Sequence, residues 1–538
     1  GLTRTAVLSS GWDEKQRSHC ILLFSAAYIR YYMSKYDSEL SSTLASIFAL
    51  AIALFTTALI PVDIFLVSYM KNSNGEYEDW ANSSSVRKDI ERSVLYAYLS
   101  LYCLVAFCIF ILLPFIYFFY EEKDEDSTCK SRCCTALKYL IVFVIFAAVL
   151  CFVGAFVPTK SPPGANSTEW KQIEALINDM GHNGGEDAIS FTISVLSLIG
   201  MFSLILYTAY GMSSLPIGLI RGRLDAKKER MEVQEQCDST GEEIRRKRGR
   251  KRLTKRDETS VKKLEESEHL MERRLRHLLA KENSCVNKCL KCLRPFEMVF
   301  GILISLMGLL VFISLLLSNI DKAIHSGGYK MGYALPKRHL PNPIDIVLVY
   351  SQKVFPLDYI LMCGVVVYFV FCSMSGIRNM GIWFFWIRIY KIRVRRTRPQ
   401  GLLMLCMILM FIILAINIML YELTPQYSSF GSQHYRVTSA SILYNYYMLQ
   451  INSTSPLEPC TTAVSTEYCT ATQMVVLLTR FFYKMSFFGA AYYFGTWIFL
   501  GVFLLGFIVA VIRGRRSSIS GDVEDSDFEE SDEELISG

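Results

Sequence analysis

The stretch GLLMLCMILMFIILAINIMLYEL, residues Gly401–Leu423, is apolar over nearly its whole length. A helix needs roughly 20 mainly apolar residues to cross the hydrocarbon core of a bilayer, so this stretch is predicted to span a membrane. A shorter run at residues 20–32 includes Arg30 and is too short to cross unaided, but we count it as well. Seven further long runs occur along the chain: Thr43–Met70, Val94–Tyr120, Leu137–Val157, Ala188–Met212, Phe296–Ser318, Phe355–Ser375 and Gly489–Ile512.

The composition agrees with this pattern, because 52% of the residues are hydrophobic and only 20% are charged, which is unusual for a soluble domain of this size. We predict an all-α polytopic membrane protein with about nine transmembrane helices. Its parts are an amino-terminal membrane region of five helices (1–212), a charged cytosolic insert (213–295), a carboxyl-terminal membrane region of four helices (296–512) and an acidic, disordered cytosolic tail (513–538).

The orientation follows from lysine and arginine, which are retained on the cytosolic side of membrane helices. The segments Arg221–Arg294 and Arg378–Arg398 are rich in both and are predicted to be cytosolic, with an exoplasmic amino terminus and a cytosolic carboxyl terminus. Glycan acceptor triplets begin at Asn82, Asn166 and Asn452, each in a loop predicted to be exoplasmic. Two independent patterns therefore favour the same topology.

The cysteines divide between the two sides. Cys460 and Cys469 share the last exoplasmic loop and are predicted to form a disulfide, because that compartment is oxidising. Palmitoylation, unmodified thiols and a zinc site are the alternatives for the cytosolic cysteines, and the zinc site lacks a clear fourth ligand. These cysteines are Cys129, Cys133, Cys134, Cys285, Cys289 and Cys292.

The cytosolic insert contains one amphipathic pattern, which predicts a helix from about Thr259 to Lys281. This helix either packs on its own protein or forms a coiled coil with a partner or with a second copy in a homodimer. Its apolar positions, three, four or seven residues apart, are Val261, Leu264, Met271, Leu275 and Leu278.

The charged segments have two explanations each. The basic run Arg245–Arg252 resembles a nuclear or nucleic-acid-binding signal, but in a cytosolic loop it is better explained by topology and anionic lipid, so no nucleic acid is expected as a partner. In the tail, Ser526 and Ser531 each precede an acidic residue by three positions and are phosphorylation candidates. Asp532–Ile536 resembles an acidic dileucine-type sorting signal.

The sequence contains no catalytic motif of the metalloprotease, phosphate-loop or serine-hydrolase type, and we expect neither an enzyme nor a bound metal. The polar candidates at membrane depth are Asp63 and Asp358, each two residues after a proline, Pro61 and Pro356, which are predicted to kink their helices. Either the two carboxylates line an exoplasmic-facing vestibule that binds a ligand or protons, or they cap backbone amides and pair at helix entry points.

Several blocks resemble the limb-region-1-like family of nine-helix membrane proteins. They are TALIPVDIFLVSYMK (Thr57–Lys71), Tyr120–Asp124, Tyr207–Ser213, SGIRNMGIWFFWIRIYKIR (Ser375–Arg393) and Ala490–Gly495. The resemblance runs from about Tyr36 to the acidic tail, and the first 35 residues do not match well.

The resemblance implies a lysosomal membrane protein that accompanies a cobalamin-exporting ABC transporter from the endoplasmic reticulum to lysosomes and supports cobalamin export. It also implies a role at the plasma membrane and in clathrin-coated vesicles, with a clathrin adaptor and the insulin receptor as partners. The stretch Lys227–Met231 lacks the tyrosine of the family's adaptor signal, so adaptor binding would need another element of the chain, such as the tail. A transporter or channel that itself takes cobalamin as ligand, and a receptor for an extracellular ligand, remain as alternatives.

Overall fold

The structure is a computed structural model. It describes residues 18–34, 39–72, 75–122, 129–156, 184–222, 226–249, 255–283, 285–329, 332–333, 335, 339–351, 354, 356–384, 387–395, 397–436, 457–460, 469–484 and 486–512.

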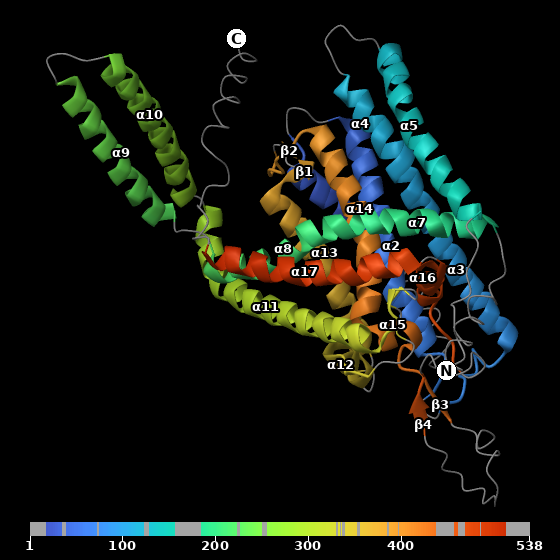
Figure 1. Ribbon diagram of the computed structural model, residues 1–538. Helices are drawn as coiled ribbons and strands as arrows, with labels where there is room; N and C mark the ends of the chain where they lie inside the picture. The colour runs from blue at the N-terminus through green and yellow to red at the C-terminus, as the bar shows by residue number, and fades with distance from the viewer. Residues whose placement is uncertain are drawn as a thin grey trace, which may run out of the picture. The chain divides into compact units, whose positions relative to one another are not determined.

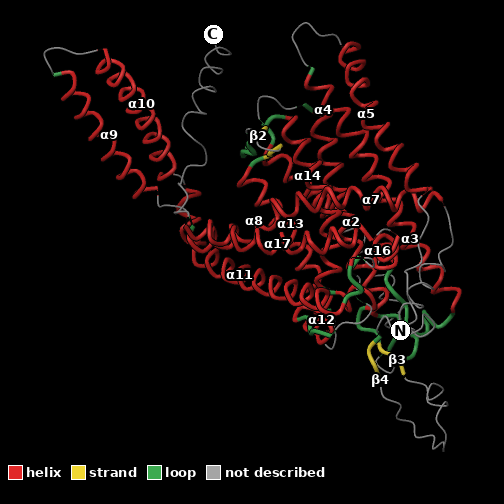
Figure 2. Tube along the Cα trace, viewed as in Figure 1, coloured by secondary structure: helices red, strands yellow, loops and turns green. Residues whose placement is uncertain are grey.

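Eight helices in the described residues are long and apolar enough to cross a membrane, and each covers most or all of one of the eight long runs predicted from the sequence (Figures 1 and 2). The chain is therefore a polytopic, mainly helical membrane protein. Residues 18–32 form a further, shorter helix that is not among these eight, so the count of nine stays a prediction. The eight are α2 (Leu40–Ser68), α3–η1–α4 (Ser84–Phe107, Cys108–Leu112, Leu113–Glu121), α5 (Cys129–Phe156), α7–η2–α8 (Gly184–Ser203, Leu204–Thr208, Ala209–Arg221), α11 (Cys285–His325), α13 (Leu357–Met380), α14 (Pro399–Leu423) and α17 (Ser486–Ile512).

Several of these helices extend beyond their apolar runs. Helix α11 begins at Cys285, within the segment predicted as a cytosolic insert, and α8 continues to Arg221. Backbone hydrogen bonding does not stop at the membrane surface, and the flanking arginine and lysine side chains favour helix as well. Hydropathy therefore predicts where a helix crosses the bilayer, but it does not predict where the helix ends.

The chain divides into two compact units. The first consists of Gly1–Met212 and Met307–Leu505, and the second of Ser213–Leu306 and Gly506–Gly538. Within the first unit, α14 packs against α2, α4, α7 and α13, and α5 packs on α4 and α7. Helix α14 has the most buried apolar window of the eight spans, which makes it the centre of this unit.

Helices η2–α8 and α13 approach each other closely at two glycines. A Cβ atom on Gly376 would lie 1.9 Å from the Tyr207 carbonyl oxygen, and one on Gly211 would lie 1.9 Å from the Cys372 carbonyl oxygen. Small residues allow helix backbones to approach in this way inside membranes.

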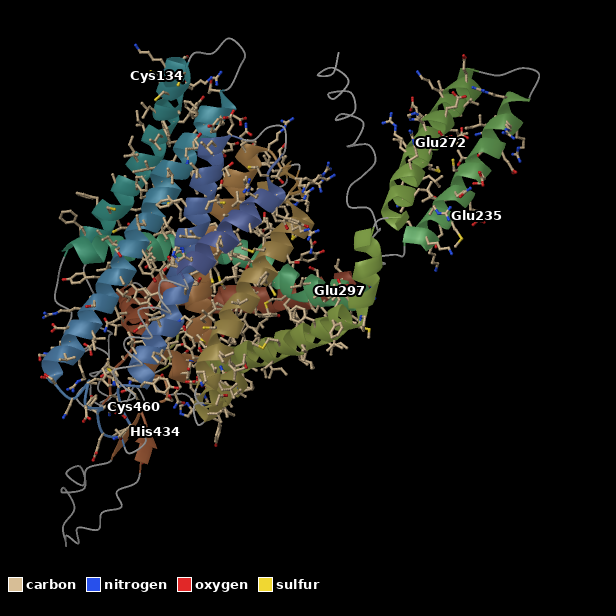
Figure 3. All side chains as sticks on the ribbon, turned by 180° about the vertical axis from the view of Figure 1, so that it is seen from behind. Cys134, Glu235, Glu272, Glu297, His434 and Cys460 are labelled. Carbon is tan, nitrogen blue, oxygen red and sulfur yellow. A yellow bond between two sulfur atoms is a disulfide. The ribbon has the colours of Figure 1, made fainter. Side chains whose placement is uncertain are left out.

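Short elements gather at one end of the first unit: α12 (Pro343–Ser351), α15 (Pro425–Phe430), α16 (Gln473–Lys484), and the antiparallel strands β3 (His434–Arg436) and β4 (Leu457–Pro459) (Figure 1). The strands β1 (Ile382–Phe384) and β2 (Ile387–Tyr390), also antiparallel, follow α13. Figure 3 shows Cys134 at the start of α5 and Cys460 beside β4 at opposite ends of this unit.

The second unit contains a helical hairpin of α9 (Ala226–Arg248) and α10 (Lys255–Asn283), with Glu235 and Glu272 on its two arms in Figure 3. Val233 on α9 and Leu278 on α10 form a small buried cluster, against which Met271 and Leu275 pack. The buried carboxylate of Glu229 accepts a hydrogen bond from Arg274 at 2.8 Å. The amphipathic stripe of α10 thus packs on α9 of the same chain.

Candidate functional site

Asp63, in the last third of α2, is buried and caps another helix. Its Oδ2 accepts a hydrogen bond from the Met474 amide at 3.0 Å, and the Gln473 amide also faces the carboxylate. Both amides belong to the first turn of α16, whose N–H groups have no partner within their own helix. A carboxylate there is stabilised by the helix dipole as well.

Asp358, in the first turn of α13, is buried and accepts hydrogen bonds from two tyrosines. The Tyr427 hydroxyl donates to Oδ2 at 2.9 Å and the Tyr69 hydroxyl donates to Oδ1 at 3.3 Å. Tyr69 follows α2 and Tyr427 lies in α15, so this carboxylate joins three elements. Burial, and then the Asp358 charge, raises the pKa of Tyr427, so that its hydroxyl stays protonated and donates.

Asp345 belongs to the same arrangement, although the sequence analysis did not single it out. Its Oδ1 accepts from the Tyr427 amide at 2.8 Å and its Oδ2 accepts from the Gln426 amide at 2.9 Å, which caps the start of α15. Asp345 is also two residues after a proline, Pro343, so the Pro-x-Asp spacing was the signal that could have found it. It was missed because it lies outside the long apolar runs.

Asp63, Asp345 and Asp358 form one layer of carboxylates with Tyr427. Asp345 and Asp358 share Tyr427, through its amide and its hydroxyl, whereas Asp63 accepts from α16. The structure thus gives Asp63 and Asp358 distinct structural contacts. The kink predicted at Pro356 is wrong, because this proline directly precedes α13 and begins the helix, whereas Pro61 lies inside α2.

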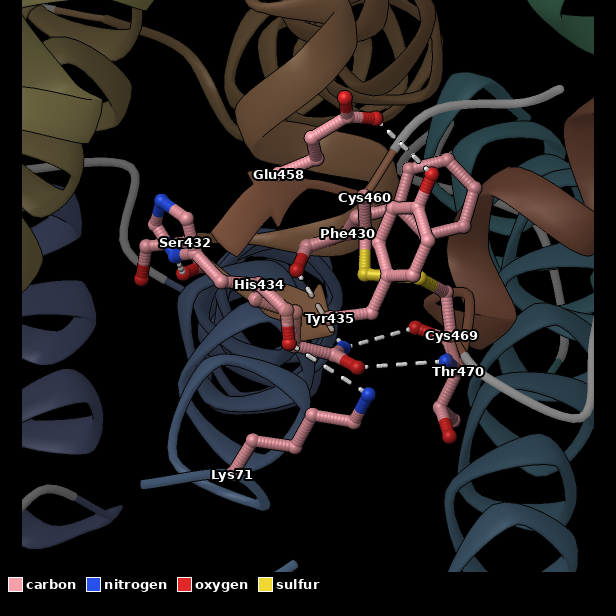
Figure 4. Close-up of a disulfide and its surroundings, with 10 residues drawn as sticks. Lys71, Phe430, Ser432, His434, Tyr435, Glu458, Cys460, Cys469 and Thr470 are labelled. Carbon is pink, nitrogen blue, oxygen red and sulfur yellow. Dashed lines mark hydrogen bonds between the residues drawn. A yellow bond between two sulfur atoms is a disulfide. The ribbon is translucent and has the colours of Figure 1, made fainter. Parts of the chain in front are cut away.

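A disulfide joins Cys460 to Cys469 beside this layer, and Figure 4 shows its surroundings. The buried Gln433 side chain lies between the segment that carries Cys460 and the segment that carries Cys469. Its Nε2 donates to the Thr470 carbonyl oxygen at 2.9 Å, its Oε1 accepts from the Thr470 amide at 3.2 Å, and its backbone carbonyl accepts from the Cys460 amide at 2.9 Å. One side chain thereby fixes the hairpin of β3 and β4 to the segment that enters α16.

Lys71 lies next to this hairpin and donates to the His434 carbonyl oxygen at 3.5 Å (Figure 4). Its ammonium group also lies over the Tyr77 ring, 4.9 Å from the centroid. Burial, followed by the charge of Arg87, lowers the pKa of Lys71 to about 8. The ammonium form is therefore held in an unfavourable, partly desolvated position.

The other predicted sites lie apart from this layer. Asn82 is exposed just before α3, and Cys129, Cys133 and Cys134 lie in the first turns of α5. Cys285, Cys289 and Cys292 lie at the start of α11, but their side chains are outside the described residues. Asn166, Asn452, Ser526, Ser531 and the tail 513–538 also lie outside the described residues.

These contacts describe a layer that holds helix ends together. Every carboxylate in it accepts hydrogen bonds from amides or tyrosines, and those amides and hydroxyls obtain the partners that buried polar groups need. Its chemistry is that of capping and positioning, and we refer to Asp63, Asp345, Asp358 and Tyr427 together as the capping layer.

Comparison with known proteins places the chain among named relatives. It is 48% identical over 525 residues to a "Probable lysosomal cobalamin transporter" of Nematostella vectensis, covering 96% of each chain. It is 46% and 47% identical to the "Lysosomal cobalamin transport escort protein LMBD1" of Gallus gallus and Homo sapiens, with 96% of this chain and 95% of each relative covered. No solved structure matches.

A family model described as "LMBR1-like membrane protein" matches residues 18–299. The match begins well before Tyr36, so the expectation that the first 35 residues differ from the family is wrong for those from residue 18 onward. The family match and the near-complete coverage of the relatives lead to one conclusion: the chain belongs to the LMBR1-like membrane protein family.

Proposed function

We propose that this chain is a lysosomal membrane escort protein that associates with a cobalamin-exporting ABC transporter, brings it from the endoplasmic reticulum to the lysosome and supports cobalamin export to the cytosol. The observation that carries the proposal is the similarity, over 96% of the chain, to relatives named for lysosomal cobalamin transport and escort.

The capping layer supports an escort over a pump. A transport path needs polar groups that exchange partners with a solute, whereas Asp63 and Asp358 are buried and bonded to amides and hydroxyls of the same chain. This arrangement suits a scaffold that keeps its shape while a partner is carried.

The proposed topology puts the capping layer and the disulfide on the lumenal side, and the α9–α10 hairpin in the cytosol. It is supported by the exposed position of Asn82 before α3, by the disulfide, and by the separation of Cys134 from Cys460 at opposite ends of the first unit. In this topology the hairpin offers a cytosolic surface to a partner.

The test is made in cells that lack the endogenous protein and express the full chain. We expect an ABC transporter to co-purify with the chain, to reach lysosomes only when the chain is present, and to restore cobalamin release into the cytosol. An ABC transporter that reaches lysosomes and exports cobalamin equally well without the chain contradicts the proposal.

A transporter that acts by itself is the second candidate, because the relative from Nematostella vectensis is named a probable transporter. Purified chain in liposomes would then move cobalamin without another protein. Flux that is lost in both Asp63→Asn and Asp358→Asn, with folding intact, would favour this candidate over the escort.

We do not propose a clathrin-adaptor or insulin-receptor role for this chain. Lys227–Met231, which lacks the tyrosine, lies within α9 and has a helical backbone.

A further inference from the structure

Three potential metal ligands meet where α11 ends. Asp321 and His325 are four residues apart, which puts them on the same face of the helix. The Asp321 Oδ1 lies 2.9 Å from the His325 Nδ1. The Asp321 side chain is 1% exposed, so its carboxylate is buried near the carboxyl end of α11.

The third ligand is His339, which comes from the segment between α11 and α12. Its backbone amide donates to the Asp321 Oδ2 at 3.0 Å, and its Nδ1 lies 4.0 Å from the Asp321 Oδ1. The two imidazole rings are stacked, with centroids 4.1 Å apart. The backbone contact therefore holds the second histidine beside the first without using its ring.

The spacing of the three groups suits one metal ion. Their ligand atoms all lie within 4.8 Å of one another. Metal–ligand distances of about 2.0–2.2 Å place tetrahedral ligands roughly 3.4 Å apart. Rotation of the side chains would bring these ligand atoms to that spacing. The hydrogen bond from the His339 backbone amide to the Asp321 Oδ2 leaves Oδ1 directed at both imidazoles. Hydrogen bonds to the non-coordinating oxygen orient metal-binding carboxylates in the same way.

Charge favours a cation here. The adjacent Lys322 forms an ion pair with the buried Glu422, so its charge is directed to that carboxylate. Asp321 instead faces two histidines, and a buried carboxylate is stabilised by a paired cation or a metal. His325 and His339 are 35% and 50% exposed, which leaves the cluster open to an ion from solution.

We propose that Asp321, His325 and His339 bind one divalent transition-metal ion of the zinc class. Two imidazole nitrogens and one carboxylate oxygen suit such ions better than calcium or magnesium, which prefer oxygen ligands alone. Three protein ligands leave a coordination position for an outside ligand. This proposal does not depend on the proposed escort function, because its test measures metal binding alone.

The test uses the full-length protein in nanodiscs, stripped with a chelator and titrated with Zn²⁺ against a chromophoric competitor. We expect one equivalent to bind with a dissociation constant of about 1 μM or lower. X-ray absorption of the Zn²⁺ form should show nitrogen and oxygen ligands at about 2.0–2.2 Å. Binding only at millimolar Zn²⁺ would overturn the proposal.

Variants assign the site. His339→Asn changes an exposed side chain, and it should weaken Zn²⁺ binding at least about tenfold while thermal unfolding of the stripped protein stays unchanged. His325→Asn should do the same. His434→Asn is the matched control, because His434 lies on β3 and contacts the Ser432 carbonyl oxygen outside the cluster. Equal affinity in His339→Asn, His325→Asn and the unchanged protein would refute the assignment.

Discussion

At the scale of single residues, Tyr427 shows how tightly the capping layer is connected. Its amide donates to Asp345 and its hydroxyl donates to Asp358, so one residue joins the first turns of α12 and α13 through α15. Removing an acceptor from such a pair leaves a buried donor unsatisfied, which costs about 1–3 kcal/mol. The stability of this layer therefore depends on individual hydrogen bonds.

Replacing Asp358 tests this dependence. We expect Asp358→Ala to lower the free energy of unfolding by about 1–3 kcal/mol, because the Tyr427 and Tyr69 hydroxyls lose their acceptor. Asp358→Asn keeps an acceptor oxygen and should lose less. Thermal unfolding in detergent measures both, with the exposed Asp79→Ala as the control. Equal effects of Asp358→Ala and Asp79→Ala would argue against a structural role.

Lys71 gives a pH dependence. Because its pKa is lowered to about 8 in the folded protein, the unfolded chain binds the proton more tightly, and stability rises with pH between about 8 and the ordinary lysine value. Below about pH 8 the penalty is constant. Lys71→Met should therefore stabilise the protein most below pH 8, with the difference shrinking at higher pH. Unfolding midpoints of both proteins from pH 6 to 10 give the measurement, and parallel pH profiles would contradict the prediction.

At the scale of elements, η2–α8 and α13 cross closely because Gly211 and Gly376 have no side chains at the contact. Tyr207 and Cys372 contribute backbone carbonyls to the contact, and these cannot move aside as a side chain can. The Thr208 and Ser373 hydroxyls, 2.8 Å apart, form a hydrogen bond across the same crossing. Close backbone approach and a polar bridge together fix how these two helices pack.

Two glycines on α13 provide a matched comparison. Gly376→Ala should lower the free energy of unfolding by about 1–3 kcal/mol, because the new Cβ would meet the Tyr207 carbonyl oxygen. A Cβ on Gly364 would meet nothing within 4 Å, so Gly364→Ala should be neutral or stabilising by up to about 1 kcal/mol. Thermal unfolding in detergent compares the two variants. A similar loss of stability in both would show that the loss does not come from the helix crossing.

At the scale of the whole molecule, the proposed topology is tested at Asn82. A lumenal Asn82 should carry a glycan, so Asn82→Gln should reduce by one glycan the gel shift that glycosidase treatment produces. Asn72→Gln, in the same loop but without the triplet, is the control and should leave the Asn82 shift unchanged. If treatment produces no shift that depends on Asn82, the lumenal assignment of this loop loses its support.

The sequence predicts the spans well because the bilayer sets their length and polarity directly, as for Gly401–Leu423, which lies within α14. It also singles out Asp63 and Asp358, since a carboxylate in an apolar run is unusual. It does not predict their partners. One Asp63 partner, Met474, is 411 residues away, and no local pattern connects the two residues.

Smaller features escape prediction for related reasons. Asp345 shares the Pro-x-Asp spacing, but it acts from a short helix that hydropathy does not detect. The pairing of α10 with α9 is hidden because α9 offers few apolar residues beyond Val233. The cluster of Asp321, His325 and His339 joins the end of α11 to a residue that lies between α11 and α12, which spacing alone does not connect.

The bond from Asp63 to the start of α16 has a consequence for biogenesis. The ribosome releases α2 into the membrane long before the segment around Met474 is made, so the Asp63 carboxylate lies inside or beside the bilayer before its α16 partners exist. During that interval the nascent protein exposes a polar group that membrane quality control can recognise. Chains that end before α16 should therefore be degraded even though most of their transmembrane helices are complete.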